Sequence, residues 1–96
     1  MRKIPLKKIK EAICKVFDTT ERDIHSRNRQ AHHAMARQFC YYYAMPGRSY
    51  VSVADYFDRH HGAVMHGVRK IEGLKKDDWL IKSYVSAIEE ELERRP

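Results

Sequence analysis

The sequence predicts an all-α protein, a compact bundle of about six helices that contains a helix-turn-helix. Its apolar residues recur at spacings of three and four, as on one face of a helix, and outside the β-branched run at 50–57 no stretch resembles a strand. No internal repeat, low-complexity tract or linker divides the 96 residues. A chain of this length holds one modest core, so we expect a single domain over residues 1–96.

A first helix is expected after Pro5, which suits the first turn of a helix. Its apolar positions, spaced by three, four, three and one residues, are Leu6, Ile9, Ile13, Val16 and Phe17. The lysines between them are expected on the solvent side: Lys7, Lys8, Lys10 and Lys15. A short second helix should follow Thr20, which can cap it with Asp23 three residues on.

A long third helix is expected from about Gln30 to Met45, because neither Gly nor Pro interrupts this segment before Pro46-Gly47. Its stripe toward the core comprises Ala31, Ala34, Met35, Gln38, Phe39, Tyr42 and Tyr43. The run Tyr41-Tyr42-Tyr43 points in three directions on a helix, so we expect at most one or two of these rings in the core.

The next two helices form the predicted helix-turn-helix. Ser49 can cap a short helix over residues 50–57, and a second helix begins near His60 after a tight turn at Asp58 and Arg59. The apolar positions of the second helix are spaced by four, three and three residues: Val64, Val68, Ile71 and Leu74.

A last helix should start near Asp77-Asp78, whose carboxylates favour a helix N-terminus. We interpret Trp79 at its start as a core or surface-packing anchor. The final EEELERR is expected to be a solvated charged face.

The charge of the chain favours a polyanionic partner. Nineteen Lys and Arg residues against 13 Asp and Glu residues leave a net charge of +6. Residues 1–50 hold 11 basic and 4 acidic residues (net +7), whereas residues 51–96 hold 8 and 9 (net −1). We therefore expect the basic half to face nucleic acid or a similar polyanion.

Cysteine usage and hydropathy point to an intracellular protein. Cys14 and Cys40 lie in helical patterns without CxxC spacing, so we interpret them as core thiols in a reducing compartment. No apolar run approaches the ~18 residues of a membrane span, and the basic start lacks the apolar stretch of a signal peptide. The protein is expected to be soluble and cytoplasmic, without a membrane partner.

The histidines near residue 60 raise the question of metal binding or catalysis. His61 and His66 are five residues apart, which puts them about 140° apart around a helix, and no HExxH motif or cysteine pair completes a zinc site. No nucleophile motif or paired carboxylates accompany them. We expect no catalytic residue, no metal and no cofactor.

The same residues suit the start of a recognition helix. In a helix-turn-helix, the first residues of the second helix touch base edges while basic neighbours meet phosphates. Here these residues are Arg59, His60, His61, Gly62 and Ala63. Composition alone leaves a second interpretation open, in which a basic surface loop precedes an ordinary core helix.

Three motifs, RxRQ..HxxARQ, SYVSVADYF and RHHGAVxHGVRKIE, resemble the C-terminal DNA-binding domain (domain IV) of the bacterial replication initiator family, DnaA. The resemblance covers roughly residues 4–92. Residues at signature positions of the family are Phe57, Arg59, His61, Val64, Lys70 and Ile71. It implies a DnaA domain IV or Trp-repressor-like helical fold and sequence-preferring binding to double-stranded DNA in replication initiation or its regulation.

The resemblance also implies individual contacts. Arg29 matches a minor-groove residue, and Ala36-Arg37-Gln38 a phosphate-binding segment. Ser49, Tyr50 and Val51 match a polar cap and apolar groups that face thymine methyls, and His61 a DNA-contacting histidine. Arg48 is expected on a phosphate, and we leave His66 open between a phosphate contact and an exposed bystander.

Three residues depart from the family pattern. His60 replaces an aspartate, and Gly62 and Ala63 replace two hydroxyl residues, so base preference is expected to shift. The alternative to DNA reading is a protein-interaction module of DnaA-like fold that binds the initiator DnaA or another replication or mobile-element protein.

No GxxxxGK[ST] motif is present, so no ATP binding is expected of this chain. The chain is either an excised domain or a free-standing relative, and Met1 with its short basic leader favours the latter.

Overall fold

The computed structural model describes residues 3–26 and 30–94, and within these ranges helices are the only regular elements. They are α1 (Leu6–Phe17), α2 (Glu21–His25), α3 (Ala31–Ala44), α4 (Tyr50–Phe57), α5 (His61–Leu74) and α6 (Trp79–Glu93). The predicted all-α class with six helices is confirmed. The Cα radius of gyration is 12.2 Å, as expected for a compact chain of this length.

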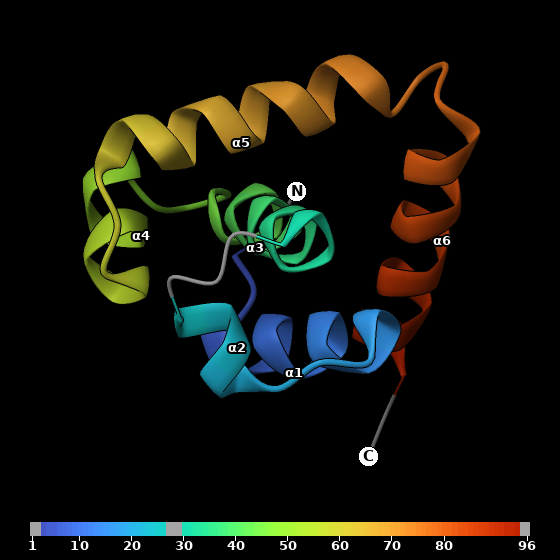
Figure 1. Ribbon diagram of the computed structural model, residues 1–96, viewed down its shortest axis with the longest axis horizontal. Coiled ribbons are helices and arrows are strands. Elements are labelled where there is room, and N and C mark those ends of the chain that lie inside the picture. Colours follow the sequence, from blue (N-terminus) through green and yellow to red (C-terminus); the bar gives the residue numbers. More distant parts are fainter. Residues whose placement is uncertain (1–2, 27–29, 95–96) are drawn as a thin grey trace.

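Helix α3 lies at the centre of the bundle (Figure 1). In this view α5 crosses one side of α3, α1 crosses the opposite side, and α6 runs along the edge between the ends of α5 and α1. The short helices α2 and α4 close the remaining edge. Helix α3 packs against α5, α1 and α2, so most of its circumference is covered.

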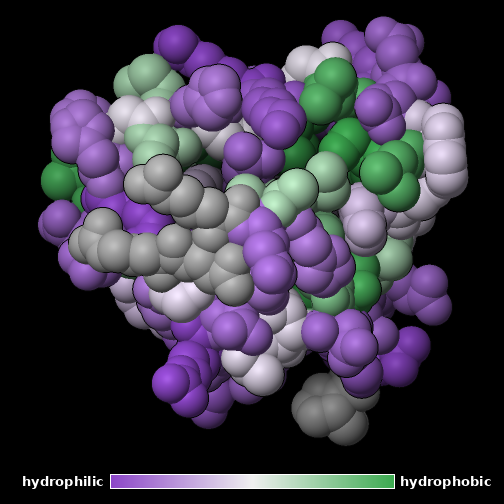
Figure 2. Space-filling model, viewed as in Figure 1, coloured by the Kyte–Doolittle hydropathy of each residue, from purple (hydrophilic) through white to green (hydrophobic). Residues whose placement is uncertain are grey.

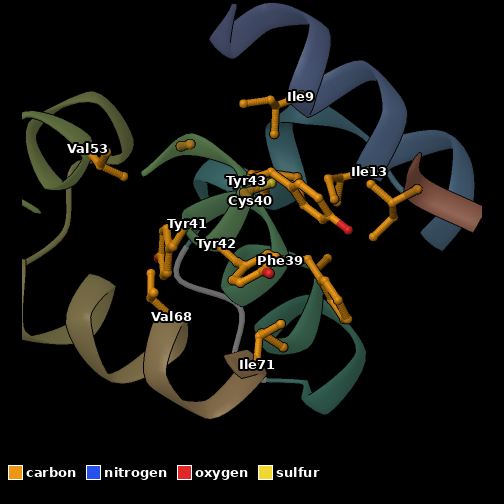
Figure 3. Packing of buried hydrophobic residues seen from close by; sticks show 14 of the residues in the cluster. Ile9, Ile13, Phe39, Cys40, Tyr41, Tyr42, Tyr43, Val53, Val68 and Ile71 are labelled. Atoms are coloured by element: carbon orange, nitrogen blue, oxygen red, sulfur yellow. The ribbon is translucent and has the colours of Figure 1, made fainter. Parts of the chain in front are cut away.

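The core is built around α3 (Figure 3). Tyr41, Tyr42 and Tyr43 are 4%, 9% and 1% exposed, so the expectation that at most two of them enter the core is wrong. A helix surrounded on several sides buries residues that point in different directions. Hydroxyl partners make this burial tolerable for two of the rings, because Tyr43 donates to Glu89 at 3.0 Å and Tyr42 accepts from Lys75 at 2.9 Å.

Lys10 was expected on the solvent side of the first helix, and this expectation is wrong. The residue is 9% exposed and lies on the inner side of α1. Its Nζ is 3.5 Å from Glu21 Oε1 and 3.3 Å from His25 Nε2, and it sits 4.9 Å from the centre of the Tyr56 ring. Burial lowers the pKa of Lys10, but the contacts with Tyr56 and Glu21 outweigh it and raise the pKa overall. The lysine therefore stays charged inside a polar cluster that joins α1, α2 and α4.

The predicted helix starts are confirmed by their caps. Thr20 accepts from the Asp23 amide, and Asp78 accepts from the amides of Leu80 and Ile81. Ser49 and Ser52 form a reciprocal capping box at the start of α4. These local contacts explain why element boundaries could be predicted closely.

The turn between α4 and α5 has a defined backbone. Asp58 ends α4 in the left-handed conformation (φ 54°), and the amide of Arg59 donates to the carbonyl of Ala54. Helix α5 then starts at His61, one residue beyond the predicted position. The helix-turn-helix at residues 50–74 is thereby confirmed in outline.

Gly67 allows α5 to cross α3 closely. A Cβ at this position would lie 3.0 Å from Tyr41 Cδ2 and 3.1 Å from Gln38 Cγ. A larger residue here would push the two helices apart and tilt α5.

Trp79 does not serve as a core anchor, because its side chain is 76% exposed at the start of α6. Leu80 and Leu74 nearby are 40% and 36% exposed. Figure 2 shows a largely hydrophilic face on which hydrophobic side chains gather between α5 and α6. None of the helices in the described part of the chain is long and apolar enough to span a membrane.

Candidate nucleic-acid interface

The first turn of α5 presents the small and polar residues that the sequence singled out. His60, His61 and Ala63 are exposed, and Gly62 is half-buried. The ring of His60 stands 4.2 Å from that of His61, measured between centroids. Their side chains therefore form one exposed pair at the N-terminus of the helix.

His60 caps α5 through its own side chain. Its Nδ1 accepts a hydrogen bond from the Gly62 amide at 3.0 Å, so Nδ1 carries no proton and any ring hydrogen is on Nε2. The aspartate of the family pattern could accept at the same place. The substitution thus keeps the acceptor needed by the helix and adds a donor, Nε2–H, to its exposed end.

Helix α4 adds an apolar contribution beside this turn. Val51 is 58% exposed, whereas Tyr50 is half-buried against the core. The Ser49 hydroxyl accepts from the Ser52 amide at 3.1 Å. Of the three residues predicted here, Ser49 and Val51 are exposed, and Val51 is the apolar one.

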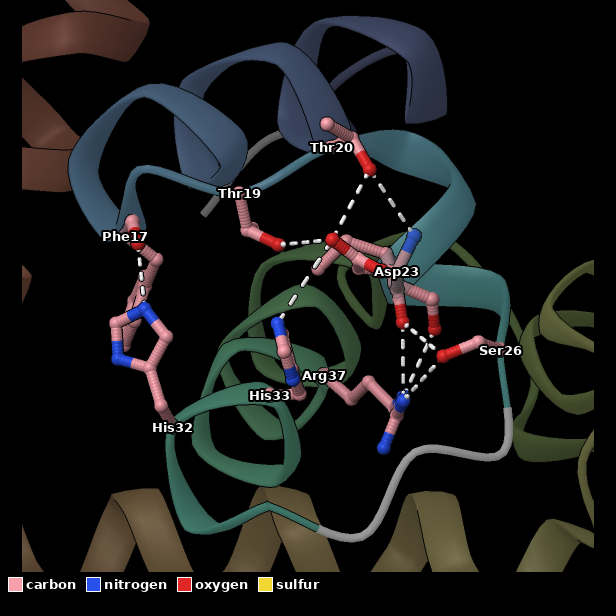
Figure 4. Close-up of polar contacts among 9 residues, drawn as sticks. Phe17, Thr19, Thr20, Asp23, Ser26, His32, His33 and Arg37 are labelled. Carbon is pink, nitrogen blue, oxygen red and sulfur yellow. Dashed lines mark hydrogen bonds and ion pairs between the residues drawn. The ribbon is translucent and has the colours of Figure 1, made fainter.

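Arg37 is placed differently from the predicted phosphate contact. It is 8% exposed, and its guanidinium donates to the carbonyls of Ile24 and Asp23 at 2.8 and 2.9 Å (Figure 4). Burial, and then the charge of Arg59, lower the pKa of Arg37. Its positive guanidinium compensates the partial negative charge of the carbonyls at the C-terminus of α2. A phosphate contact through this side chain remains a prediction, and the buried position of the side chain does not support it.

Arg59 reaches the same helix end from the turn of the helix-turn-helix. It donates to the backbone carbonyl of Ser26 and, at 3.1 Å, to that of Asp58. The structure thus brings Arg37 and Arg59 together at the C-terminus of α2, where each secures the position of α2 against the rest of the bundle. Arg59 is half-buried and keeps some exposed surface.

Arg48 is also engaged with backbone. It donates to the carbonyls of Ala44 and Ile4 at 3.0 and 2.8 Å, which ties the start of α1 to the end of α3. Gln38 is half-buried beside Gly67, and its Oε1 finds no hydrogen-bond partner among the described residues.

Sequence reasoning missed the structural work of these arginines. The groups that bind these arginines are backbone carbonyls, most of them at helix ends. Every residue has a backbone carbonyl, so the sequence does not show which of them a distant arginine will contact.

The remaining predicted residues are Arg29 and His66. Arg29 lies outside the described residues. His66 is exposed on α5 one turn beyond Gly62. Within the described ranges, no group of three or more His, Cys, Asp or Glu side chains is arranged to hold a metal ion.

Comparison with known proteins places this helix-turn-helix in a family. The profile described as "Bacterial dnaA protein helix-turn-helix" matches residues 6–71. The chromosomal replication initiator protein DnaA of Pseudothermotoga lettingae is 33% identical over 90 residues, which is 91% of this chain and 20% of that protein. The DnaA proteins of Thermoanaerobacter sp. (strain X514) and Thermoanaerobacter pseudethanolicus are each 31% identical over 96 residues, 98% of this chain and 21% of theirs.

The chain thus spans about a fifth of the length of these relatives. The match includes α4, the turn and most of α5, the segment that the geometry singles out. The chain belongs to the family of bacterial DnaA helix-turn-helix domains.

Proposed function

We propose that this chain binds double-stranded DNA through α4 and α5, with the first turn of α5 in the major groove. The observation that carries the proposal is the exposed His60-His61 pair at the N-terminus of α5, with the exposed Val51 on the preceding helix. A helix N-terminus entering the groove brings such residues to base edges and its positive dipole end toward phosphates. The net charge of +6 supports the same partner.

The base-reading group is small. The Nε2–H of His60 can donate to an acceptor in the major groove, Val51 can contact a thymine methyl, and Ala63 adds a second apolar group. Arg29, by resemblance alone, would enter the neighbouring minor groove. Sequence preference from one copy of the domain should therefore be modest, and a second copy or another domain would sharpen it.

The process proposed for this binding is replication initiation or its regulation. The relatives that share the domain are named chromosomal replication initiator proteins. The chain corresponds to a fifth of their length, so the proposal extends to DNA binding by this domain alone.

Fluorescence anisotropy of the purified chain tests the proposal. The probes are a labelled DnaA-box duplex, a scrambled duplex and a single strand, each at ~50 and ~200 mM salt, a span over which binders with many phosphate contacts lose much of their affinity. We expect salt-sensitive binding to both duplexes, with some preference for the box. Absence of binding to either duplex at ~50 mM salt would refute the proposal.

One observation favours a second candidate, the protein-interaction module. Trp79 is 76% exposed with Leu80 beside it, and a large apolar group in water is typical of a contact surface for another protein. This candidate predicts no duplex binding in the anisotropy experiment, together with binding to a replication protein that Trp79→Ala abolishes.

A further inference from the structure

The outer face of α5 continues beyond its first turn as a single stripe. Gly62, His66, Arg69 and Gly73 follow the i, i+4, i+7, i+11 spacing of one helix face, and the last three are exposed. The opposite face is buried in the core by residues Val64, Gly67, Val68 and Ile71. The stripe is thus the side of α5 that points away from the protein.

Arg69 is the cation in this stripe. It is exposed, and its side chain makes no ion pair or hydrogen bond with any other described residue, in contrast to Arg37 and Arg48, whose guanidinium groups donate to backbone carbonyls. A guanidinium held on a rigid helix is well suited to a phosphate oxygen.

The distance along the helix is also suitable. Arg69 follows His61 by eight residues, which is about 12 Å of helix at 1.5 Å per residue. The major groove is also about 12 Å wide, so a helix whose first turn lies at the bases carries this residue to the phosphates at the groove edge.

The small residues at the start of α5 permit this approach. Gly62 has no side chain and Ala63 has a single methyl group, so at these two positions little bulk separates the helix from the bases. A helix that sits deeper in the groove brings the next two turns nearer to DNA. Loss of contacts at positions 62 and 63 is then offset by contacts further along the same face.

We propose that Arg69 contacts a backbone phosphate at the edge of the major groove and so extends the DNA surface of α5 by two turns. This inference rests on the proposed function, since it needs the helix in the groove. It adds a DNA-binding residue that neither the resemblance nor the motif analysis assigned.

The test compares Arg69→Ala with the matched control Lys82→Ala, which removes the same charge from an exposed position on α6. Both variants and the parent chain are titrated against the DnaA-box and scrambled duplexes between ~50 and ~200 mM salt. Loss of one phosphate contact lowers the salt exponent by about 0.9, so the affinity lost over this span becomes about three- to fourfold smaller for Arg69→Ala. The weakening should be equal on both duplexes, because a phosphate contact carries no sequence information.

Arg69→Lys supplies the rescue, since it keeps the charge and should restore the salt exponent. Equal effects of Arg69→Ala and Lys82→Ala on the salt exponent would overturn the inference, because both would then result from the change in net charge alone. So would an unchanged titration of Arg69→Ala, or a failure of Arg69→Lys to restore the exponent, while the parent still binds duplex. If the parent bound no duplex at all, the proposed function would fail and this inference with it.

Discussion

Arg37 Nε donates to the carbonyl of Ile24, thirteen residues earlier, at 2.8 Å and in a buried position. A second nitrogen of the same guanidinium reaches the Asp23 carbonyl and the Ser26 hydroxyl, so one side chain closes the C-terminal end of α2. Removal of a buried donor leaves such acceptors unsatisfied. The side chain predicted to hold DNA therefore holds α2 to α3.

Arg37→Ala should lower the free energy of unfolding by about 1–3 kcal/mol, the usual cost of unsatisfied buried acceptors. The salt exponent of duplex binding should stay at its parent value, because no phosphate contact is lost. Urea denaturation and salt-dependent anisotropy measure the two quantities on one preparation. If Arg37→Ala were as stable as the parent and had a smaller salt exponent, Arg37 would instead be a phosphate contact.

His60 and Gly62 should be energetically coupled. A Cβ at Gly62 would lie 3.0 Å from His60 Nδ1, so Gly62→Thr alone crowds the capping ring. His60→Asp retains an acceptor for the amide of residue 62 with a smaller side chain. The unfolding free energies of the two single variants and the double variant should show a favourable coupling of about 0.5 kcal/mol or more, in the range seen for residues in contact.

The same double variant should prefer the DnaA-box duplex over the scrambled duplex more than the parent does, because it restores an acceptor-only carboxylate and a hydroxyl at family positions. Anisotropy titrations of the parent and the double variant measure this ratio. If the ratio did not change, the geometry by which the family reads bases would not be retained in this chain.

Stability should fall in mild acid because of His25. Burial, and then the charge of Lys10, lower the pKa of His25 below its ordinary value of 6.5, with Arg59 acting in the same sense and Glu21 against it. The unfolded chain therefore binds a proton more readily than the folded one. The contribution of neutral His25 to the stability of the fold is therefore complete above about pH 6.5. It decreases as the pH falls from there through the pKa of His25 in the folded state.

Urea denaturation at several pH values between ~5 and ~8 measures this effect. His25→Gln removes the titrating group and keeps an acceptor for Lys10, so its unfolding free energy should depend less on pH in this range. An identical pH dependence in the parent and in His25→Gln would show that other groups are responsible.

Two glycines of α5 should respond in opposite directions to alanine. Apart from the neighbouring backbone of α5 itself, no atom lies within 4 Å of a Cβ placed at Gly73, so Gly73→Ala should stabilise the fold by roughly 0.5–1 kcal/mol through helix propensity. Gly67→Ala should destabilise it, because its methyl meets Tyr41 and Gln38 at 3.0–3.1 Å and overpacking costs about 1–3 kcal/mol. Thermal and urea unfolding of the pair check both signs, and stabilisation by Gly67→Ala would show that α3 and α5 do not cross as closely as described.

The sequence alone determined the helices and their limits, because the signals for these lie within a few residues of each other. Thr20 and Ser49 cap the helices that they were expected to cap, and Asp78 caps the helix that was expected to start near it, since each side chain bonds to an amide two or three residues ahead. The position of the helix-turn-helix followed from the same local signals. Its family was implied by the order of short motifs.

Only the tertiary structure decided which polar and aromatic residues face outward. Lys10 was expected to face solvent, Arg37 by resemblance to contact a phosphate, and Tyr41 had no assigned face, yet all three are buried. Lys10 and Arg37 have partners eleven to fifteen residues away in the chain, Glu21 and His25 for the first and Ile24 and Asp23 for the second. Such pairs form when helices pack and bring their ends together, and no spacing within a single helix predicts them.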